Sequence, residues 1–139
     1  MKTSVTKSFT VDAAHHLPGH KGACKNLHGH TYRIEVTVAR ECQPKLIDHD
    51  MVIDFSDLKE IVDPLIKQLD HCNLNDLDQF ADMRPTAENM AMWLFDQINI
   101  NLIKSYESLS HAGYTTYPEV SSVRIFETPT SWATYPAGK

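Results

Sequence analysis

The sequence predicts an α+β fold in which two helices lie on one face of a four-stranded antiparallel sheet. Runs in which apolar and polar residues alternate occur near both ends of the chain, and two runs with helical spacing lie between them. Alternation with a period of two is typical of a strand with one buried face, whereas spacings of three and four residues are typical of an amphipathic helix. The order β-β-α-α-β-β follows, and it favours an antiparallel sheet with both helices on one side.

The first two strands are predicted over residues 4–15 and 30–39. His15 continues the apolar parity of the first strand, and His28 precedes the second strand in the same parity as His30. The apolar faces consist of Val5, Phe9, Val11 and Ala13 in the first run and of Tyr32, Ile34, Val36 and Val38 in the second.

Helix one is predicted over residues 57–69, where apolar residues recur at helical spacing. Asp54 or Ser56 can accept a hydrogen bond from the first turn and so cap the helix. Pro64 is expected to kink the helix or weaken its middle turn, because proline lacks the backbone donor and crowds the preceding turn. The apolar positions are Leu58, Ile61, Val62, Leu65, Ile66 and Leu69.

The second helix is predicted to begin after Thr86, whose hydroxyl can cap it, and to end near Lys104. Residues 105–119 are rich in Ser, Tyr and Thr and are expected to form a loop. Strand alternation returns over 120–128, and a short strand over 132–135 completes the sheet. Such a sheet has two edges with unpaired backbone groups, which predicts that copies of the chain associate.

Length and composition favour one domain over residues 1–139 that acts on a small molecule. The net charge is -5 and no basic cluster is present, which argues against binding to nucleic acid or to an acidic membrane surface. No segment resembles a signal peptide or a membrane span, so we expect a cytoplasmic protein. Its cysteines, Cys24, Cys42 and Cys72, are therefore expected to be reduced.

A metal site is predicted where the first two strands meet. His28 and His30 are two residues apart on an extended backbone, so both imidazoles point to one side, and Gly29 places no side chain between them. Parity adds His15 to this side, whereas His16 should face away. Three neutral imidazoles with an open fourth position are a known catalytic arrangement for zinc.

Cys24 lies four residues before His28, just outside the strand. A nearby cation would favour the thiolate that an attacking or proton-abstracting sulfur needs. Spacing alone leaves three alternatives: a catalytic metal, a closed structural site with Cys24 as fourth ligand, or ordinary polar residues at a strand end with Cys24 as a small buried residue. Cys42 and Cys72 have no comparable surroundings.

Asp70, His71 and Glu127 are further candidates. A carboxylate can orient an imidazole for proton transfer, but position alone favours a histidine that interacts with the dipole at the end of helix one. Glu127 lies on the apolar parity of its strand, where a charge needs a partner. It can accept two hydrogen bonds from an amidine-like edge, as in a pterin ring, or form a buried salt bridge, and position does not decide between them.

Taken together, these segments resemble the family of 6-pyruvoyl-tetrahydropterin synthases and 6-carboxytetrahydropterin synthases. The resemblance spans nearly the whole chain. It rests on Phe9 to His15, Cys24 to His30, Ile53-Asp54-Phe55, Leu69-Asp70-His71 with Leu74-Asn75, Pro85-Thr86-Ala87-Glu88-Asn89 and the strand end Glu127-Thr128. It implies a tunnelling fold, in which subunits of two helices and four strands form trimeric barrels that stack into a homohexamer with sites between subunits.

The resemblance also implies roles for individual residues and a substrate. The roles are zinc ligands for His15, His28 and His30, a catalytic triad of Cys24, Asp70 and His71 that reaches across an interface, and substrate contacts by Glu127, Thr128 and Thr86. The implied substrate is 7,8-dihydroneopterin triphosphate.

The three-residue gap between Cys24 and His28 resembles the carboxy branch of the family, a lyase on the route to queuosine that releases acetaldehyde and triphosphate. The pyruvoyl branch, which only eliminates triphosphate, is the alternative. A non-enzymatic module stabilised by zinc is a second alternative. A third is a dihydroneopterin aldolase of the same fold, against which the histidine set argues because that aldol chemistry has no known need for zinc.

Overall fold

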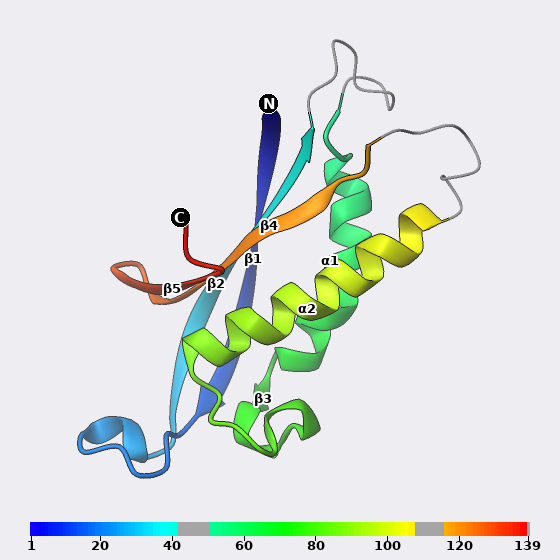
Figure 1. Ribbon diagram of the computed structural model, residues 1–139. Helices are drawn as coiled ribbons and strands as arrows, with labels where there is room; N and C mark the ends of the chain where they lie inside the picture. Colours follow the sequence, from blue (N-terminus) through cyan, green and yellow to red (C-terminus); the bar gives the residue numbers. More distant parts are fainter. Residues whose placement is uncertain (42–50, 108–115, 139) are drawn as a thin grey trace.

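A five-stranded sheet carries two helices in the computed structural model, which describes residues 1–41, 51–107 and 116–138 (Figure 1). The strand order is β3-β1-β2-β4-β5. The elements are β1 (Lys2–His15), β2 (His28–Glu41), α1 (Phe55–Leu69), β3 (Cys72–Asn73), α2 (Ala87–Tyr106), β4 (Glu119–Thr128) and β5 (Ser131–Tyr135). The predicted α+β class with two helices is therefore confirmed.

The prediction of a four-stranded, purely antiparallel sheet is wrong. β3 pairs with the end of β1 in parallel, with Ala13 opposite Cys72 and Ala14 opposite Asn73. The pairs β1-β2, β2-β4 and β4-β5 are antiparallel, as expected. Two residues are too few to show alternation, so β3 arises only because the chain returns along β1 after α1. The order of elements is β-β-α-β-α-β-β.

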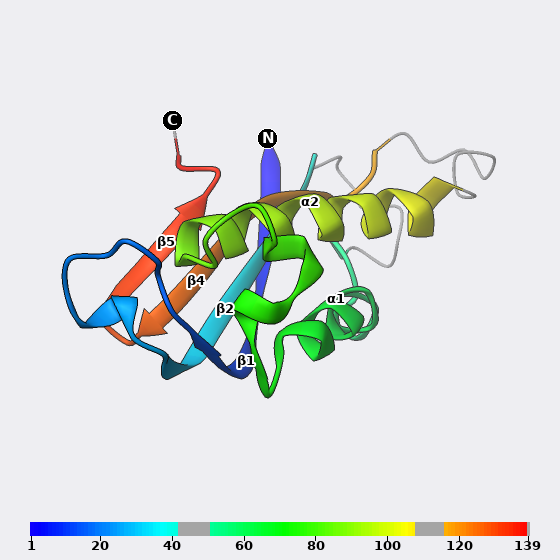
Figure 2. The same ribbon diagram turned by 90° about the horizontal axis from the view of Figure 1, so that it is seen from below.

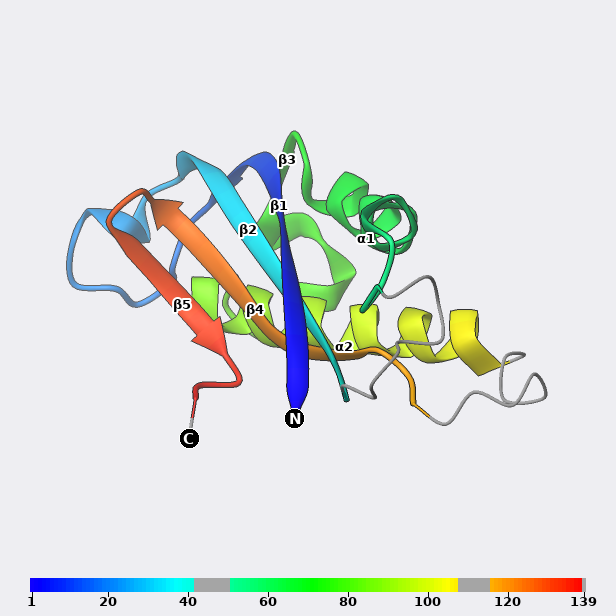
Figure 3. The same cartoon turned by 90° about the horizontal axis from the view of Figure 1, so that it is seen from above.

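Both helices pack against one face of the sheet, the face formed by the odd-numbered residues of β1, which places α1 beside β1 and α2 across β4 and β5 (Figures 2 and 3). This face and the helices share one buried core. Strand residues of that core include Phe9, Val11, Ile34, Val36, Val123 and Ile125, and helix residues include Leu58, Val62, Leu69, Met90, Leu94 and Ile98. The apolar parity predicted from the sequence therefore identifies the face of the sheet that the helices cover.

Helix α1 begins two residues before the predicted start and is capped by Asp54, whose carboxylate accepts a hydrogen bond from the Ser56 amide at 2.7 Å. It continues through Pro64 without interruption. Pro64 is exposed, so the carbonyl that its ring deprives of a donor lies on the solvent side of the helix while the apolar side stays packed.

Helix α2 has the predicted cap, because the Asn89 amide donates to the Thr86 hydroxyl at 3.1 Å. It ends at Tyr106, and β4 begins at Glu119. Residues 108–115 of the predicted loop lie outside the described residues, as does Cys42. None of the helices in the described part of the chain combines the length and hydrophobicity needed to cross a bilayer.

Candidate metal centre

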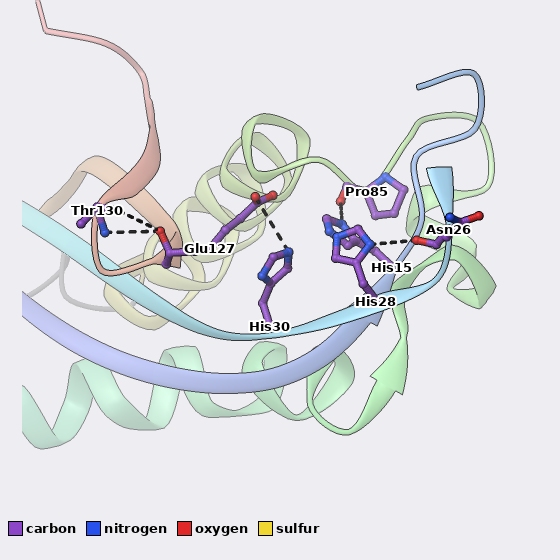
Figure 4. A network of polar contacts seen from close by, with 8 residues as sticks. His15, Asn26, His28, His30, Pro85, Glu127 and Thr130 are labelled. Carbon is purple, nitrogen blue, oxygen red and sulfur yellow. Dashed lines mark hydrogen bonds and ion pairs between the residues drawn. The ribbon is translucent and has the colours of Figure 1, made fainter. Parts of the chain in front are cut away.

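Three imidazole rings meet at the end of the β1-β2 pair, on the helix-covered side of the sheet (Figure 4). The ring centroids of His15 and His28 are 4.6 Å apart, those of His28 and His30 are 4.9 Å apart, and those of His15 and His30 are 5.2 Å apart. One nitrogen of each ring lies within 4.8 Å of the others. The group can therefore offer three nitrogen ligands to a single metal ion.

Strand register produces this convergence. His15, the last residue of β1, lies opposite His28, the first residue of β2, and Ala13 lies opposite His30. Directly opposed residues and residues two apart on one strand share a face of the sheet. Three rings therefore point to one side, where two adjacent strands hold them.

Two of the rings have their protonation fixed by backbone carbonyls. His15 Nδ1 lies 2.7 Å from the Pro85 carbonyl oxygen, and His28 Nδ1 lies 2.8 Å from that of Asn26 (Figure 4). A carbonyl oxygen only accepts, so each Nδ1 carries a proton, which leaves Nε2 as the nitrogen of each ring that can offer a lone pair to a metal ion. Metal-ligating histidines typically have this second hydrogen bond to their other nitrogen.

The remaining nitrogens also fit a metal site. His15 is only 1% exposed, and among the described residues the buried Nε2 atoms of His15 and His30 have no hydrogen-bond partner. Burial lowers the pKa of His30, an effect that Glu127 opposes and that His15 and His28 reinforce. Neutral rings with unpaired nitrogens are the form that binds metal.

Glu127 lies beside this group but is less buried than the sequence predicted. Its Oε2 atom is 3.9 Å from His30 Nε2, and its side chain is 31% exposed. The β4-β5 register shifts between Phe126 and Thr128, so Glu127 lies at an irregularity of the sheet, near its exposed end. A fully buried salt bridge is therefore not present, and the carboxylate keeps an open side.

Tyr32 is a neighbour of the metal centre that the sequence analysis assigned only to the core. Its ring centroid lies 5.3 Å from that of His30 and 5.9 Å from that of His15. The side chain is fully buried, its hydroxyl has no partner among the described residues, and burial together with Glu127 raises its pKa. Apolar parity gave no signal of this contact, because a tyrosine fits a core position equally well.

Cys24 lies in the loop between β1 and β2, in a short 3-10 helix (Ala23–Lys25), and is partly exposed. Its sulfur is not a member of the three-histidine group. The carbonyl of Cys24 accepts a hydrogen bond from the Leu17 amide at 2.8 Å, which folds the loop back toward the end of β1. This placement favours three histidine ligands over a closed site with four ligands.

Asp70 and His71 form a pair of their own, in a group with Asp12 that is separate from the three histidines. His71 Nδ1 lies 2.8 Å from Asp70 Oδ2, and Asp70 Oδ1 accepts from the Asp12 amide at 2.9 Å. The Asp12 amide and His71 hold the pKa of Asp70 below its usual value, and Asp70 raises the pKa of His71. The His71 side chain is 77% exposed, so its ring is oriented by a carboxylate and directed outward.

The two threonines have mainly local roles in the described chain. Thr86 is partly buried, and its hydroxyl is used to cap α2. The Thr128 hydroxyl lies 3.3 Å from the hydroxyl of Thr130 in the β4-β5 turn and is exposed. Their predicted contacts with substrate remain predictions.

The sequence model of the family described as 6-pyruvoyl tetrahydropterin synthase matches residues 4–138. The chain belongs to this family. It is therefore a lyase-type enzyme, and the expected family membership is confirmed.

Relatives within the family have different names. A 6-carboxy-5,6,7,8-tetrahydropterin synthase from Haemophilus influenzae is 37% identical over 94% of this chain and 96% of its own length. A dihydroneopterin monophosphate aldolase from Pyrococcus furiosus is 38% identical over 73% of this chain and 80% of its own length. The structure of 6-pyruvoyl tetrahydropterin synthase from Caenorhabditis elegans aligns with a TM-score of 0.78 and 26% identity, over 99% of this chain and 97% of the other.

These relatives change one argument from the sequence. A relative that is 38% identical to this chain is named as an aldolase. An aldolase therefore remains an alternative for this chain.

Proposed function

We propose that this chain is a zinc-dependent 6-carboxytetrahydropterin synthase. It would convert 7,8-dihydroneopterin triphosphate and water to 6-carboxy-5,6,7,8-tetrahydropterin, acetaldehyde and triphosphate, a step toward 7-deazaguanines such as queuosine. The observation that carries the proposal is the convergence of three imidazoles on one point in a chain of this family. The names of several relatives that are 34–40% identical over most of the chain support the carboxy reaction.

His15, His28 and His30 would hold the zinc ion through their Nε2 atoms, because carbonyls occupy Nδ1 of the first two rings. A bound zinc ion would polarise substrate oxygens and stabilise negative charge that develops beside them. The protein's own contribution is to hold the three rings on two paired strands, with backbone carbonyls fixing the tautomers of His15 and His28.

Cys24 would remove a proton from the substrate side chain. Its position in the loop next to the histidines, outside the ligand group, leaves its sulfur free for this role. Asp70 and His71 would complete proton transfer as an oriented acid-base pair. Because this pair lies apart from the histidines within one chain, it would act at the site of a neighbouring subunit, which agrees with the proposed homohexamer.

Glu127 would bind the pterin ring. Its carboxylate is partly exposed and lies 3.9 Å from His30, so a ring that donates hydrogen bonds to it would lie next to the metal centre. A carboxylate can pair with the parallel N–H donors of a pterin through two hydrogen bonds. Thr128, at the end of the same strand, and Thr86, at the start of α2, are the further proposed contacts.

A product assay tests the proposal. Purified protein is incubated with zinc and dihydroneopterin triphosphate, and the products are identified by mass spectrometry and an acetaldehyde assay. Carboxypterin with acetaldehyde supports the proposal. Pyruvoylpterin indicates the pyruvoyl reaction. In parallel incubations, glycolaldehyde released from dihydroneopterin, or glycolaldehyde phosphate released from its monophosphate, indicates an aldolase. The absence of product from all three substrates contradicts the proposed function.

Substitution of Cys24 separates the catalytic site from a structural zinc module. In Cys24→Ala, we expect activity to be lost while bound zinc and assembly are kept. Cys72→Ala is the matched control, since the Cys72 sulfur contacts the Leu69 carbonyl at 3.0 Å instead of the metal centre. Loss of zinc or of folded protein in Cys24→Ala would instead favour the structural module.

A further inference from the structure

The side chain of Asn75 extends the edge of the sheet next to the metal centre. Its Oδ1 atom accepts from the His16 amide at 2.8 Å, and its Nδ2 atom donates to the His16 carbonyl at 2.9 Å. A carboxamide has one acceptor and a donor pair, so it can replace the peptide group of a neighbouring strand. Since Asn73 of β3 lies opposite Ala14, the side chain of Asn75 continues the β3-β1 contact beyond the end of β1.

His16 connects two parts of the proposed site. The residue before it is His15, the most buried ring of the metal centre. The residue after it is Leu17, whose amide donates to the Cys24 carbonyl at 2.8 Å. Any movement of the His16 backbone would therefore be transmitted to the loop that carries Cys24.

The body of the domain holds Asn75 in place. Its backbone amide donates to Asn73 Oδ1 at 3.1 Å, and the preceding Leu74 is fully buried in the core. Asn75 itself is partly buried. The loop is thus attached to a fixed point of the structure instead of being held only by its own hydrogen bonds.

We propose that Asn75 is a positioning residue that fixes the Cys24 loop against the metal centre. The proposal rests on the proposed function, which makes Cys24 the reacting thiol. Asn75 acts through the backbone of His16 and Leu17, and two hydrogen bonds to one residue fix both its place and its orientation.

Two variants of Asn75 and a control test this role. Asn75→Ala removes both hydrogen bonds. Asn75→Asp keeps the size of the side chain and one acceptor, but a carboxylate oxygen then faces the His16 carbonyl in place of the donor. Gln79→Ala is the control, because it also removes a side-chain amide from this part of the chain. The Gln79 amide makes only an exposed contact of 3.4 Å with the Gln68 side chain.

In zinc-loaded protein, we expect kcat for dihydroneopterin triphosphate to fall about tenfold in both Asn75 variants, equivalent to about 1.4 kcal/mol of transition-state stabilisation. KM should stay within about threefold, since the proposed role concerns the reacting thiol and not substrate affinity. Iodoacetamide should alkylate Cys24 faster, because a loosened loop exposes its sulfur, with Cys24→Ala as the blank for the other thiols. Gln79→Ala should match the wild type throughout.

Unchanged kcat and unchanged alkylation in Asn75→Ala would overturn the proposal. A loss of kcat that Asn75→Asp does not share would also overturn it, because packing volume then explains the effect. The same holds if kcat falls only in proportion to bound zinc or folded protein. Alkylation needs no substrate, so if the wild type forms no carboxypterin, the proposed function fails while the positioning of Cys24 is still measured.

Discussion

Zinc should stabilise the protein through His15 but not through the adjacent His16. His15 is 1% exposed, its Nε2 belongs to the three-histidine group, and its Nδ1 lies 2.7 Å from the buried Pro85 carbonyl. His16 has its backbone held by Asn75, and its side chain is not a member of the group. His15→Ala and His16→Ala therefore remove the same side chain from neighbouring positions with opposite expected results.

The expected changes in stability differ clearly between the two variants. Free zinc at a hundred times its dissociation constant stabilises a folded state by about 2.7 kcal/mol, which for a chain of this length raises Tm by roughly 10 °C. Without zinc, His15→Ala should cost about 1–3 kcal/mol, because the Pro85 carbonyl loses its donor while buried. His16→Ala should change stability by less than about 0.5 kcal/mol.

Differential scanning fluorimetry with and without zinc, together with metal analysis of the purified proteins, measures these effects. The wild type and His16→Ala should show the full rise in Tm and equal zinc content, whereas His15→Ala should show neither. A zinc-dependent rise in His15→Ala, or its loss in His16→Ala, would refute the assignment of the buried ring as a ligand.

Three further predictions follow from the same geometry. Burial holds the pKa of His30 in the folded chain below 6.5, its value in the unfolded chain. Between these two pKa values the unfolded chain binds a proton that the folded chain does not. The contribution of His30 to folding stability is therefore present above pH 6.5 and is lost as the pH falls toward the folded pKa. Bound zinc and Tm should therefore both decrease on acidification from about pH 7 to 5, and zinc content that stays constant would contradict neutral imidazole ligands. Asp70 raises the pKa of His71 above 6.5, so Asp70→Asn should lower it toward that value in an NMR titration of the ring; an unchanged pKa would show that another group is responsible. Thr86→Ala should cost about 1 kcal/mol in urea unfolding because the Asn89 amide loses its cap, whereas Thr86→Ser should be nearly neutral, and equal losses in both would mean that the methyl group matters more than the hydroxyl.

Local patterns in the sequence predicted the features that depend on one element at a time. Strand parity distinguished His15 from His16 and identified the covered face of β1 and β2, because successive side chains of a strand alternate between faces. Thr86 could also be identified as a cap from local sequence, since a cap needs only a hydroxyl before a helical run.

Tertiary structure decided the features that need two distant segments. β3 is two residues long and exists only through its pairing with β1, and Asn75 contacts His16 across 59 positions of the chain. Glu127 lies at a register shift between β4 and β5 and 3.9 Å from His30 of β2, so its surroundings depend on two partner strands. The sequence by itself thus determined which side chains share a face, since that follows from backbone period. Register and chain return determined which of them meet, because those depend on pairing between strands that no local pattern encodes.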